Sequence, residues 1–192
     1  MVCDKCDGPH DTVLCPHFAH GRDKHRDAWQ HYKKPPPSAS VEKATAVRVG
    51  RVTPMPGDGN CLFHALAHNV REKLGLHVNH ASVRAAVSML ISRSPDQLIN
   101  GEPIRSWIKW DSAHTPDIYA KRMAKLGVWG GGIEIAIVAA IFKAKVRVWA
   151  PVMQNRYAHI ADFGDDDQIF DLVYVGRAHY NAIRILDDPH SE

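Results

Sequence analysis

The sequence predicts an α+β fold with a mixed β-sheet packed between helices, and two observations carry this prediction. Apolar residues recur at helical spacing through the middle of the chain, whereas the final third alternates in the manner of β-strands. Helices gathered first and strands gathered last are typical of an α+β layout. With 192 residues, 45% of them hydrophobic and 23% charged, the chain has the size and composition of one globular domain with a small appendage.

Proline marks the boundary between that appendage and the main domain. Three consecutive prolines at positions 35–37 fix the backbone and withhold N–H groups, and small polar residues follow them. We therefore expect a linker over residues 35–45, a small Cys/His-rich module over 1–34 and the main domain over 46–192. The module contains few large aliphatic residues, so it needs a staple such as a metal ion in order to fold.

The main domain is expected to begin with a short strand over residues 46–52, followed by a turn rich in proline and glycine. A helix that begins at Cys61 should stop at Gly75, and Pro116 suits the first turn of a later helix. Helices are predicted at residues 61–74, 80–92, from 116 onward, and 133–142. Strands are predicted at residues 146–149, 157–160, 169–175 and 180–185.

Cys61 follows a glycine-containing turn and falls in the first turn of a predicted helix. Gly57 and Gly59 allow the chain to turn tightly before that helix. The unpaired N–H groups and the dipole of a helix N-terminus stabilise a thiolate, and the same N–H groups can hold a developing oxyanion. Cys61 is therefore a candidate nucleophile, and a buried structural cysteine is the alternative that these residues alone leave open.

A thiolate nucleophile needs a base, and His179 lies where the chain enters the last predicted strand. Residues two apart in a strand point to the same face, so His179 and Asn181 share one. The Asn181 amide oxygen can then accept the imidazole N–H and fix the ring orientation, which is the third role in a catalytic triad. A His-x-Asn pair is weak evidence by itself, because most of the other histidines are expected to be solvated or to pack.

Three blocks occur in order along the chain: Asp58-Gly59-Asn60-Cys61-Leu62-Phe63, Trp129-Gly130-Gly131-Gly132-Ile133-Glu134 and His179-Tyr180-Asn181. Together they resemble the ovarian-tumour (OTU) family of papain-like cysteine proteases, and the resemblance covers about residues 46–186. It implies the papain-like OTU fold. It also implies a thiol-dependent isopeptidase, a deubiquitinase, that hydrolyses ubiquitin or ubiquitin-like conjugates with no cofactor for catalysis.

The resemblance further implies a role for each residue that matches the family's motifs. Cys61 would be the nucleophile, and His179 would be the general base and then the acid for the leaving lysine amine. Asn181 would orient His179, although many relatives have Asp at this position. Asp58 would organise the loop that supplies the oxyanion hole; a turn residue that bonds its own backbone is the alternative.

Two further features lie close to these residues in the sequence. His64 departs from the family pattern, since relatives more often carry Arg or another large residue there, and it forms an i,i+4 pair with His68. That pair could bind a metal, but we interpret both as surface or supporting residues.

Trp129 and residues 130–132 are expected to form a backbone-lined stretch beside the cleft, suited to a substrate that ends in Gly-Gly. The alternative is that the glycines link two helices and Trp129 packs in the core.

The amino-terminal module has the residue types of a structural zinc site. Two cysteines separated by two residues can both reach one tetrahedral ion at about 2.3 Å. A nearby histidine and a third cysteine complete a pattern one residue short of the zinc-knuckle spacing, and three later histidines offer competing ligands. The predicted zinc ligands are Cys3, Cys6, His10 and Cys15, and the competing ligands are His17, His20 and His25.

Charge and targeting signals narrow the expected partners and location. A net charge of +3 is too small to indicate a nucleic-acid partner. The resemblance implies ubiquitin, ubiquitin-like proteins and their conjugates as partners, and we expect a monomer. The sequence shows no secretory signal and no apolar run near the length of a membrane span, so we expect an intracellular protein of the cytoplasm or nucleus.

Two rival functions are a non-catalytic ubiquitin-binding protein and a zinc-knuckle nucleic-acid binder with an attached hydrolase domain. The catalytic residue types argue against the first, and the nearly balanced charge of residues 1–34 argues against the second.

Overall fold

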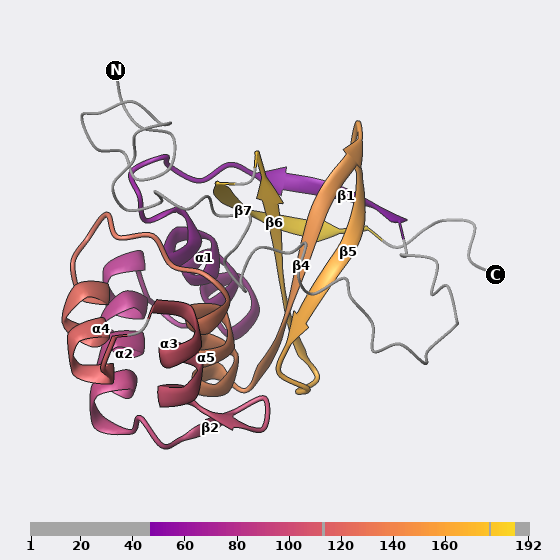
Figure 1. Ribbon diagram of the computed structural model, residues 1–192. Coiled ribbons are helices and arrows are strands. Elements are labelled where there is room, and N and C mark those ends of the chain that lie inside the picture. Colours follow the sequence, from indigo (N-terminus) through magenta and orange to yellow (C-terminus); the bar gives the residue numbers. More distant parts are fainter. Residues whose placement is uncertain (1–46, 113, 177, 187–192) are drawn as a thin grey trace.

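The computed structural model describes residues 47–112, 114–176 and 178–186, and it has the α+β architecture that the sequence predicts (Figure 1). The predicted zinc module and linker lie outside the described residues. Along the chain the elements are β1 (Val47–Thr53), α1 (Cys61–Leu74), α2 (His80–Arg93), β2 (Leu98–Ile99), β3 (Glu102–Pro103), α3 (Ile104–Ser112), α4 (Pro116–Met123), α5 (Gly132–Phe142), β4 (Ala144–Met153), β5 (Arg156–Phe163), β6 (Gln168–Val175) and β7 (His179–Ile185).

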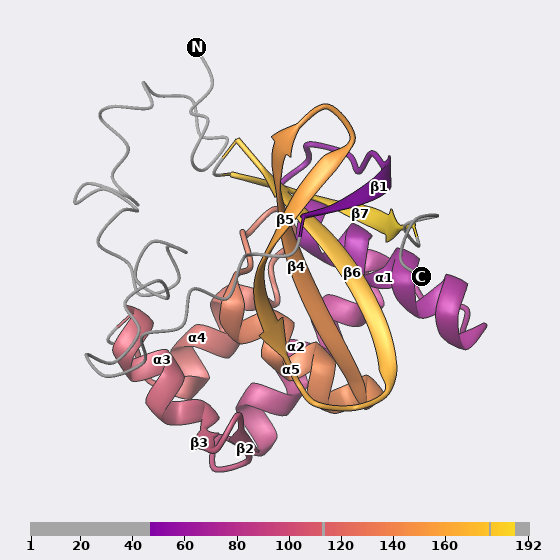
Figure 2. The same ribbon diagram turned by 90° about the vertical axis from the view of Figure 1, so that its right-hand side faces the viewer.

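The main sheet is mixed and closes on itself in the order β1-β5-β4-β6-β7. Strands β4 and β6 are parallel, and every other neighbouring pair in this sheet is antiparallel. Strand β1 closes the ring, because residues 47–49 pair with β5 and residues 50–53 pair with β7. Figure 2 shows the long, curved strands β4, β5 and β6 from the side. This closure places the end of β1 directly beside β7.

The described helices gather on one side of the sheet, so they do not enclose it from both sides as expected, and two of them contact it directly (Figure 1). Helix α1 packs against β6 and β7, and α5 packs against β4 and β5. Helix α2 lies farther out and contacts α1, α4 and α5. The side chains of α5 from Ile133 to Ala139 are all buried, which confirms the predicted buried helix. Packing between α1, α5 and the sheet forms most of the hydrophobic core.

Local signals located most elements well. Gly75 ends α1 with a positive φ of 67°, which glycine adopts without strain. Thr115 caps α4, with its hydroxyl accepting from the Ile118 N–H, and Pro116 occupies the first turn. The β2–β3 hairpin and α3 were not predicted, because two-residue strands show no alternation and nine residues give few helical repeats. The Asn100-Gly101 turn, with both φ values positive, was the available hairpin signal.

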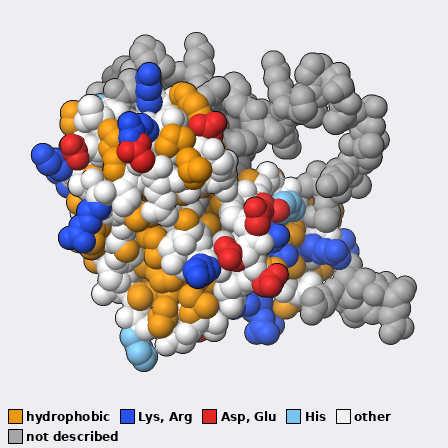
Figure 3. Space-filling model, turned by 90° about the horizontal axis from the view of Figure 1, so that it is seen from below, with side chains coloured by type: hydrophobic (Ala, Val, Ile, Leu, Met, Phe, Trp, Pro, Cys, Tyr) orange, Lys and Arg blue, Asp and Glu red, His pale blue; other side chains and the backbone are white. Residues whose placement is uncertain are grey.

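The face opposite the β1–α1 loop carries a shallow hollow. Hydrophobic side chains gather on this lower face, which Figure 3 shows from below. The hollow, of about 450 Å³, is lined by Leu98 of β2, by Ala136 and Ala140 of α5, and by Asp165 and Asp166.

None of the helices in the described part of the chain combines the length and the apolar character that a membrane-spanning helix needs.

Candidate active site

The loop between β1 and α1 delivers Cys61 to the start of a helix. Cys61 is the first residue of α1, and its side chain is only 8% exposed. Asn60, which precedes it, makes no side-chain cap to the helix, so the N–H groups of the first turn are not consumed by that side chain. The position therefore has the features that stabilise a thiolate and a developing oxyanion.

Gly59 is required in this loop for two reasons. Its φ is +76°, a conformation that side-chain-bearing residues rarely adopt, and a Cβ there would lie 2.5 Å from the carbonyl oxygen of Gly127. The loop before Cys61 therefore packs backbone to backbone against the segment that precedes α5. Gly57, two residues earlier, has no atom within 4 Å of the place a Cβ would take.

Replacing Gly59 by alanine should lower the free energy of unfolding by about 2–3 kcal/mol, because the methyl group both strains φ and collides with backbone. Chemical denaturation measures this loss. The matched Gly57→Ala variant should stay within about 0.5 kcal/mol of wild type, since its methyl group meets open space. Equal losses in the two variants would show that the contact with Gly127 does not constrain the loop.

Asp58 joins the loop to the first turns of α1. Its Oδ1 accepts the Asn60 N–H at 2.9 Å, and its Oδ2 lies 3.0 Å from Nε2 of His64. Partial burial would raise the pKa of Asp58, but the hydrogen bonds with His64 and Asn60 outweigh burial and lower that pKa to about 2. The carboxylate is therefore ionised at neutral pH. The bond to Asn60 is the turn interaction considered as an alternative role, and the contact with His64 is additional.

His179 and Asn181 share one face of β7 and form a hydrogen bond. Nε2 of His179 lies 3.0 Å from Oδ1 of Asn181, and the Met55 N–H donates to the same Oδ1 at 2.7 Å. An atom that accepts from a backbone N–H must be the amide oxygen, so Nε2 of the imidazole must donate to it. In the neutral imidazole, Nδ1 is then the nitrogen that can accept a proton.

The fold brings the Cys61 loop to this strand. Near the start of this loop the Met55 N–H donates to Oδ1 of Asn181, and at its end the loop leads into Cys61. Helix α1 packs against β7, and Cys61 belongs to the same buried cluster as Tyr180 and Ala182 of that strand. The four predicted site residues, Asp58, Cys61, His179 and Asn181, therefore lie on α1, on the neighbouring strand β7 and in the loop that leads from β1 into α1.

Arg84 supports the loop and was not singled out from the sequence. Only 1% of this residue is exposed, and its guanidinium donates to Oδ1 of Asn60 at 2.9 Å and to the Val128 and Met123 carbonyl oxygens at 2.6 and 3.0 Å. Gly127 N–H also donates to Oδ1 of Asn60, at 2.8 Å. The sequence held a signal for this role. Arg84 lies three residues before Val87 and seven before Ile91, which places it on the buried face of α2.

Burial also affects the pKa of the Arg84 guanidinium. Desolvation lowers the pKa of Arg84 to about 10, against the opposing attraction of Glu134. The residue remains a cation at neutral pH, and its guanidinium carbon lies 4.0 Å from the centre of the Phe63 ring. The loop before Cys61 is thus held by a buried cation whose hydrogen bonds go to neutral acceptors.

The glycine-rich segment before α5 packs against α1. A Cβ at Gly130 would lie 2.9 Å from Cδ2 of Leu62 and 3.1 Å from Cε2 of Phe63, so the close approach needs glycine. The Gly131 N–H donates to Oε2 of Glu134 at 2.6 Å, and this bond organises the start of α5. Packing against α1 therefore accounts for Gly130. The expectation that Trp129 and its neighbours line a substrate channel stays a prediction.

Glu134 is a buried acid whose ionisation should affect stability. Complete burial raises the pKa of Glu134 to about 7, although hydrogen bonds from Gly131 and Tyr119 favour the carboxylate. The folded protein thus keeps this proton up to about pH 7, whereas the unfolded chain loses it near the ordinary value of 4.5. Unfolded chains bind fewer protons across this window, so stability falls as pH rises.

We expect the contribution of Glu134 to the free energy of unfolding to fall by about 3 kcal/mol between pH 4.5 and 7. Denaturation of wild type and of Glu134→Gln at a series of pH values measures it, since the variant lacks this component. Glu72→Gln, at an exposed position of α1, is the control and should retain the wild-type slope. The same slope in Glu134→Gln would contradict the elevated pKa.

In the part of the chain that the structure describes, the histidines near the site are not grouped with enough further ligands for a metal centre. Within residues 47–112, 114–176 and 178–186, no group of three or more potential metal-ligating side chains occurs. His64 contacts Asp58, in agreement with a supporting role. The predicted zinc ligands Cys3, Cys6, His10 and Cys15 lie outside the described residues.

Comparison with known proteins relates this arrangement to a family. Residues 56–180 match the family described as OTU-like cysteine protease. The chain is 26% identical over 171 residues to "Putative ubiquitin thioesterase L96" of Tipula iridescent virus, covering 85% of this chain but 19% of that protein. It is 27% identical over 143 residues to OVARIAN TUMOR DOMAIN-containing deubiquitinating enzyme 4 of Arabidopsis thaliana, covering 71% of this chain and 44% of that one. The chain thus spans less than half the length of either relative.

Solved structures show the same fold. The Hazara virus OTU bound to ubiquitin superimposes with a TM-score of 0.57 at 22% identity, covering 73% of this chain and 84% of that one. An OTU deubiquitinase from Wolbachia pipientis wMel bound to ubiquitin gives a TM-score of 0.52 at 17% identity, covering 72% and 96%. Because the match to the family spans more than half of the sequence, this chain belongs to the OTU-like cysteine protease family.

Proposed function

We propose that the protein is a deubiquitinase that hydrolyses isopeptide bonds of ubiquitin or ubiquitin-like conjugates through a Cys61-His179-Asn181 triad. The observation that carries this proposal is the hydrogen bond between Nε2 of His179 and an Asn181 oxygen whose orientation is fixed by the Met55 N–H. It leaves Nδ1 as the basic nitrogen on a strand that packs against the helix bearing Cys61.

The reaction proceeds by acyl transfer through the thiol of Cys61. His179 accepts the thiol proton, and the thiolate attacks the carbonyl carbon of the modifier's terminal glycine. The tetrahedral oxyanion is held by backbone N–H groups at the start of α1 and in the loop before it. His179 then protonates the departing lysine amine, which leaves a thioester. Water, activated by the same imidazole, releases the free carboxylate and returns the proton to sulfur.

Asp58 and Asn60 prepare the loop for this chemistry. Asp58 ties its own carboxylate to the Asn60 N–H, while the Asn60 amide oxygen is held by Arg84 and Gly127. These bonds fix the backbone immediately before Cys61 ahead of substrate binding. Preorganised donors stabilise a developing charge better than donors that must reorient. We therefore assign Asp58 to support of the oxyanion loop.

Ubiquitin is the favoured substrate because two neighbours of the same fold were solved with it. The Hazara virus and Wolbachia OTU structures each contain bound ubiquitin. The sequence relatives from Tipula iridescent virus and Arabidopsis carry the names of a ubiquitin thioesterase and a deubiquitinating enzyme. The substrate class proposed for this chain is accordingly a modifier with a flexible carboxy-terminal tail joined to lysine.

Steady-state hydrolysis of ubiquitin bearing a fluorogenic carboxy-terminal amide tests the proposal. Wild type should release the fluorophore, and Cys61→Ala should lose at least about 10⁴-fold in kcat, because the nucleophile is absent. Binding of ubiquitin by the Cys61→Ala variant should persist. Binding by wild type without turnover of ubiquitin or ubiquitin-like substrates would instead identify a non-catalytic binding protein.

A further inference from the structure

His64 lies one turn into α1 and reaches back to the loop that precedes Cys61. Its Nε2 is 3.0 Å from Oδ2 of Asp58, while Oδ1 of the same carboxylate accepts the Asn60 N–H at 2.9 Å. A single carboxylate thus connects a side chain of the helix to the backbone directly before the proposed nucleophile.

A second imidazole lies against the first. His80, the first residue of α2, has its ring centre 4.1 Å from that of His64, with the planes inclined by 35°. The start of α2 is fixed by reciprocal bonds between Asn79 and Ser82, at 2.9 and 3.0 Å. His80 is therefore held in place by its own helix. Its ring covers one side of the His64 imidazole.

The charges around this stack are compatible with a stable contact. Asp58 is the acidic group that contacts His64, and the charges of Asp58 and Arg84 both influence the pKa of His80, in opposite directions. Burial, aided by the proximity of His64, lowers the pKa of His80, which disfavours a second positive charge beside His64.

We propose that His64, supported by His80, is a positioning residue that holds Asp58 against the Asn60 N–H and thereby fixes the oxyanion loop; this rests on the proposed function. The side chain of Asp58 is 45% exposed, so water competes for its oxygens and the carboxylate is free to rotate without a second anchor. The His64 side chain is 21% exposed and supplies that anchor. A small displacement of oxyanion donors costs much of their effect on rate.

Three single variants separate this role from a general effect on α1. His64→Ala should lower kcat about tenfold with KM within about twofold of wild type, because the loop relaxes while the binding surface remains. His64→Gln places an N–H donor near the position of Nε2 and should recover to within about threefold of wild-type kcat. His68→Ala, one turn farther along α1 with no bond to Asp58, should match wild type.

Coupling and amide exchange provide the readouts that a merely structural role would not move. In an Asp58→Ala background, His64→Ala should add less than about twofold, because the two side chains act as one unit. Hydrogen exchange measured by NMR should be faster at the Asn60 amide in His64→Ala, and unchanged in His68→Ala.

The outcomes for the inference and for the proposed function are distinguishable. Turnover of ubiquitin by wild type tests the function, whereas the His64 ratios and the Asn60 exchange rate test the positioning role, and exchange needs no substrate. Wild-type kcat in His64→Ala, or unchanged exchange at Asn60, would overturn the inference. Additive losses in the double variant would also overturn it.

Discussion

Replacing His179 by alanine should lower kcat for a ubiquitin carboxy-terminal amide by at least about 10³-fold, because the thiol of Cys61 then lacks its base and the leaving amine lacks its acid. The KM should change far less, since His179 lies at the reacting atoms rather than across the binding surface. Steady-state kinetics on wild type and variant measure both constants. Asn181→Ala should lose about 10–100-fold, because His179 remains but its orientation is released.

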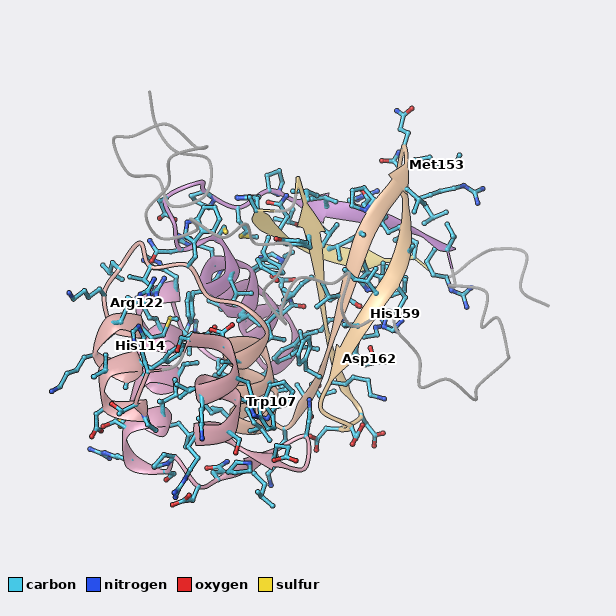
Figure 4. All side chains as sticks on the ribbon, viewed as in Figure 1. Trp107, His114, Arg122, Met153, His159 and Asp162 are labelled. Carbon is cyan, nitrogen blue, oxygen red and sulfur yellow. The ribbon has the colours of Figure 1, made fainter. Side chains whose placement is uncertain are left out.

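Another histidine that pairs with a polar side chain, His159, provides the control for this experiment. His159 lies on β5 with its Nε2 2.7 Å from Oδ1 of Asp162, so it also pairs with a neighbouring polar side chain (Figure 4). It belongs to a different part of the sheet, and His159→Ala should retain wild-type kcat. If His179→Ala kept more than about a tenth of wild-type kcat, the assignment of His179 as the base would be wrong.

Replacing Arg84 by methionine should reduce the free energy of unfolding by about 4 kcal/mol, the largest loss of stability expected of a single substitution here. The buried Met123 carbonyl, the buried Asn60 amide oxygen and the partly buried Val128 carbonyl would all lose a charged donor. Each such bond contributes about 1.5–3 kcal/mol, partly offset by relief of burying the cation. Denaturant unfolding followed by fluorescence measures the change.

Arg122 on α4 offers a matched control, because it is exposed to solvent (Figure 4). Arg122→Met should change stability by less than about 0.5 kcal/mol. Arg84→Lys should fall between Arg84→Met and wild type, since one ammonium cannot reach three acceptors in the geometry of a guanidinium. Equal stability of Arg84→Met and wild type would contradict the conclusion that the hydrogen bonds of Arg84 hold the loop before Cys61 in place.

Periodicity and caps account for the part of the fold that the sequence predicted. The helices beginning at Cys61, His80 and Pro116 start within one residue of their expected positions, since each follows a turn or a cap that acts locally. The strands of the final third are also in place: burial alternates along the first part of β4 and is continuous through the middle of β6, and both patterns are typical of strands. The closure of β1 onto both β5 and β7 was not predicted, because strand partners depend on contacts between distant segments.

Residues of the candidate site whose side chains can take part in the reaction were predicted from the sequence. Residues that only hold another residue in place were missed. Cys61 and His179 lie in sequence motifs that identify them as candidate catalytic residues. The spacing of His179 and Asn181 correctly indicated the hydrogen bond between their side chains. Arg84 has no motif, because its partners are mostly backbone carbonyls 39 and 44 residues away. The contact between His64 and Asp58 depends on how the loop folds back over α1, which spacing alone does not reveal.

The most direct test uses ubiquitin that carries a thiol-reactive electrophile at its carboxy terminus. Under reducing conditions, wild type should form a covalent adduct, and peptide mapping by mass spectrometry should place the modification on Cys61. Cys61→Ala should form none, although three other cysteines remain in the chain. No adduct on wild type with ubiquitin or any ubiquitin-like modifier, or an adduct that survives in Cys61→Ala, would contradict the assignment of Cys61 as the nucleophile of a deubiquitinase.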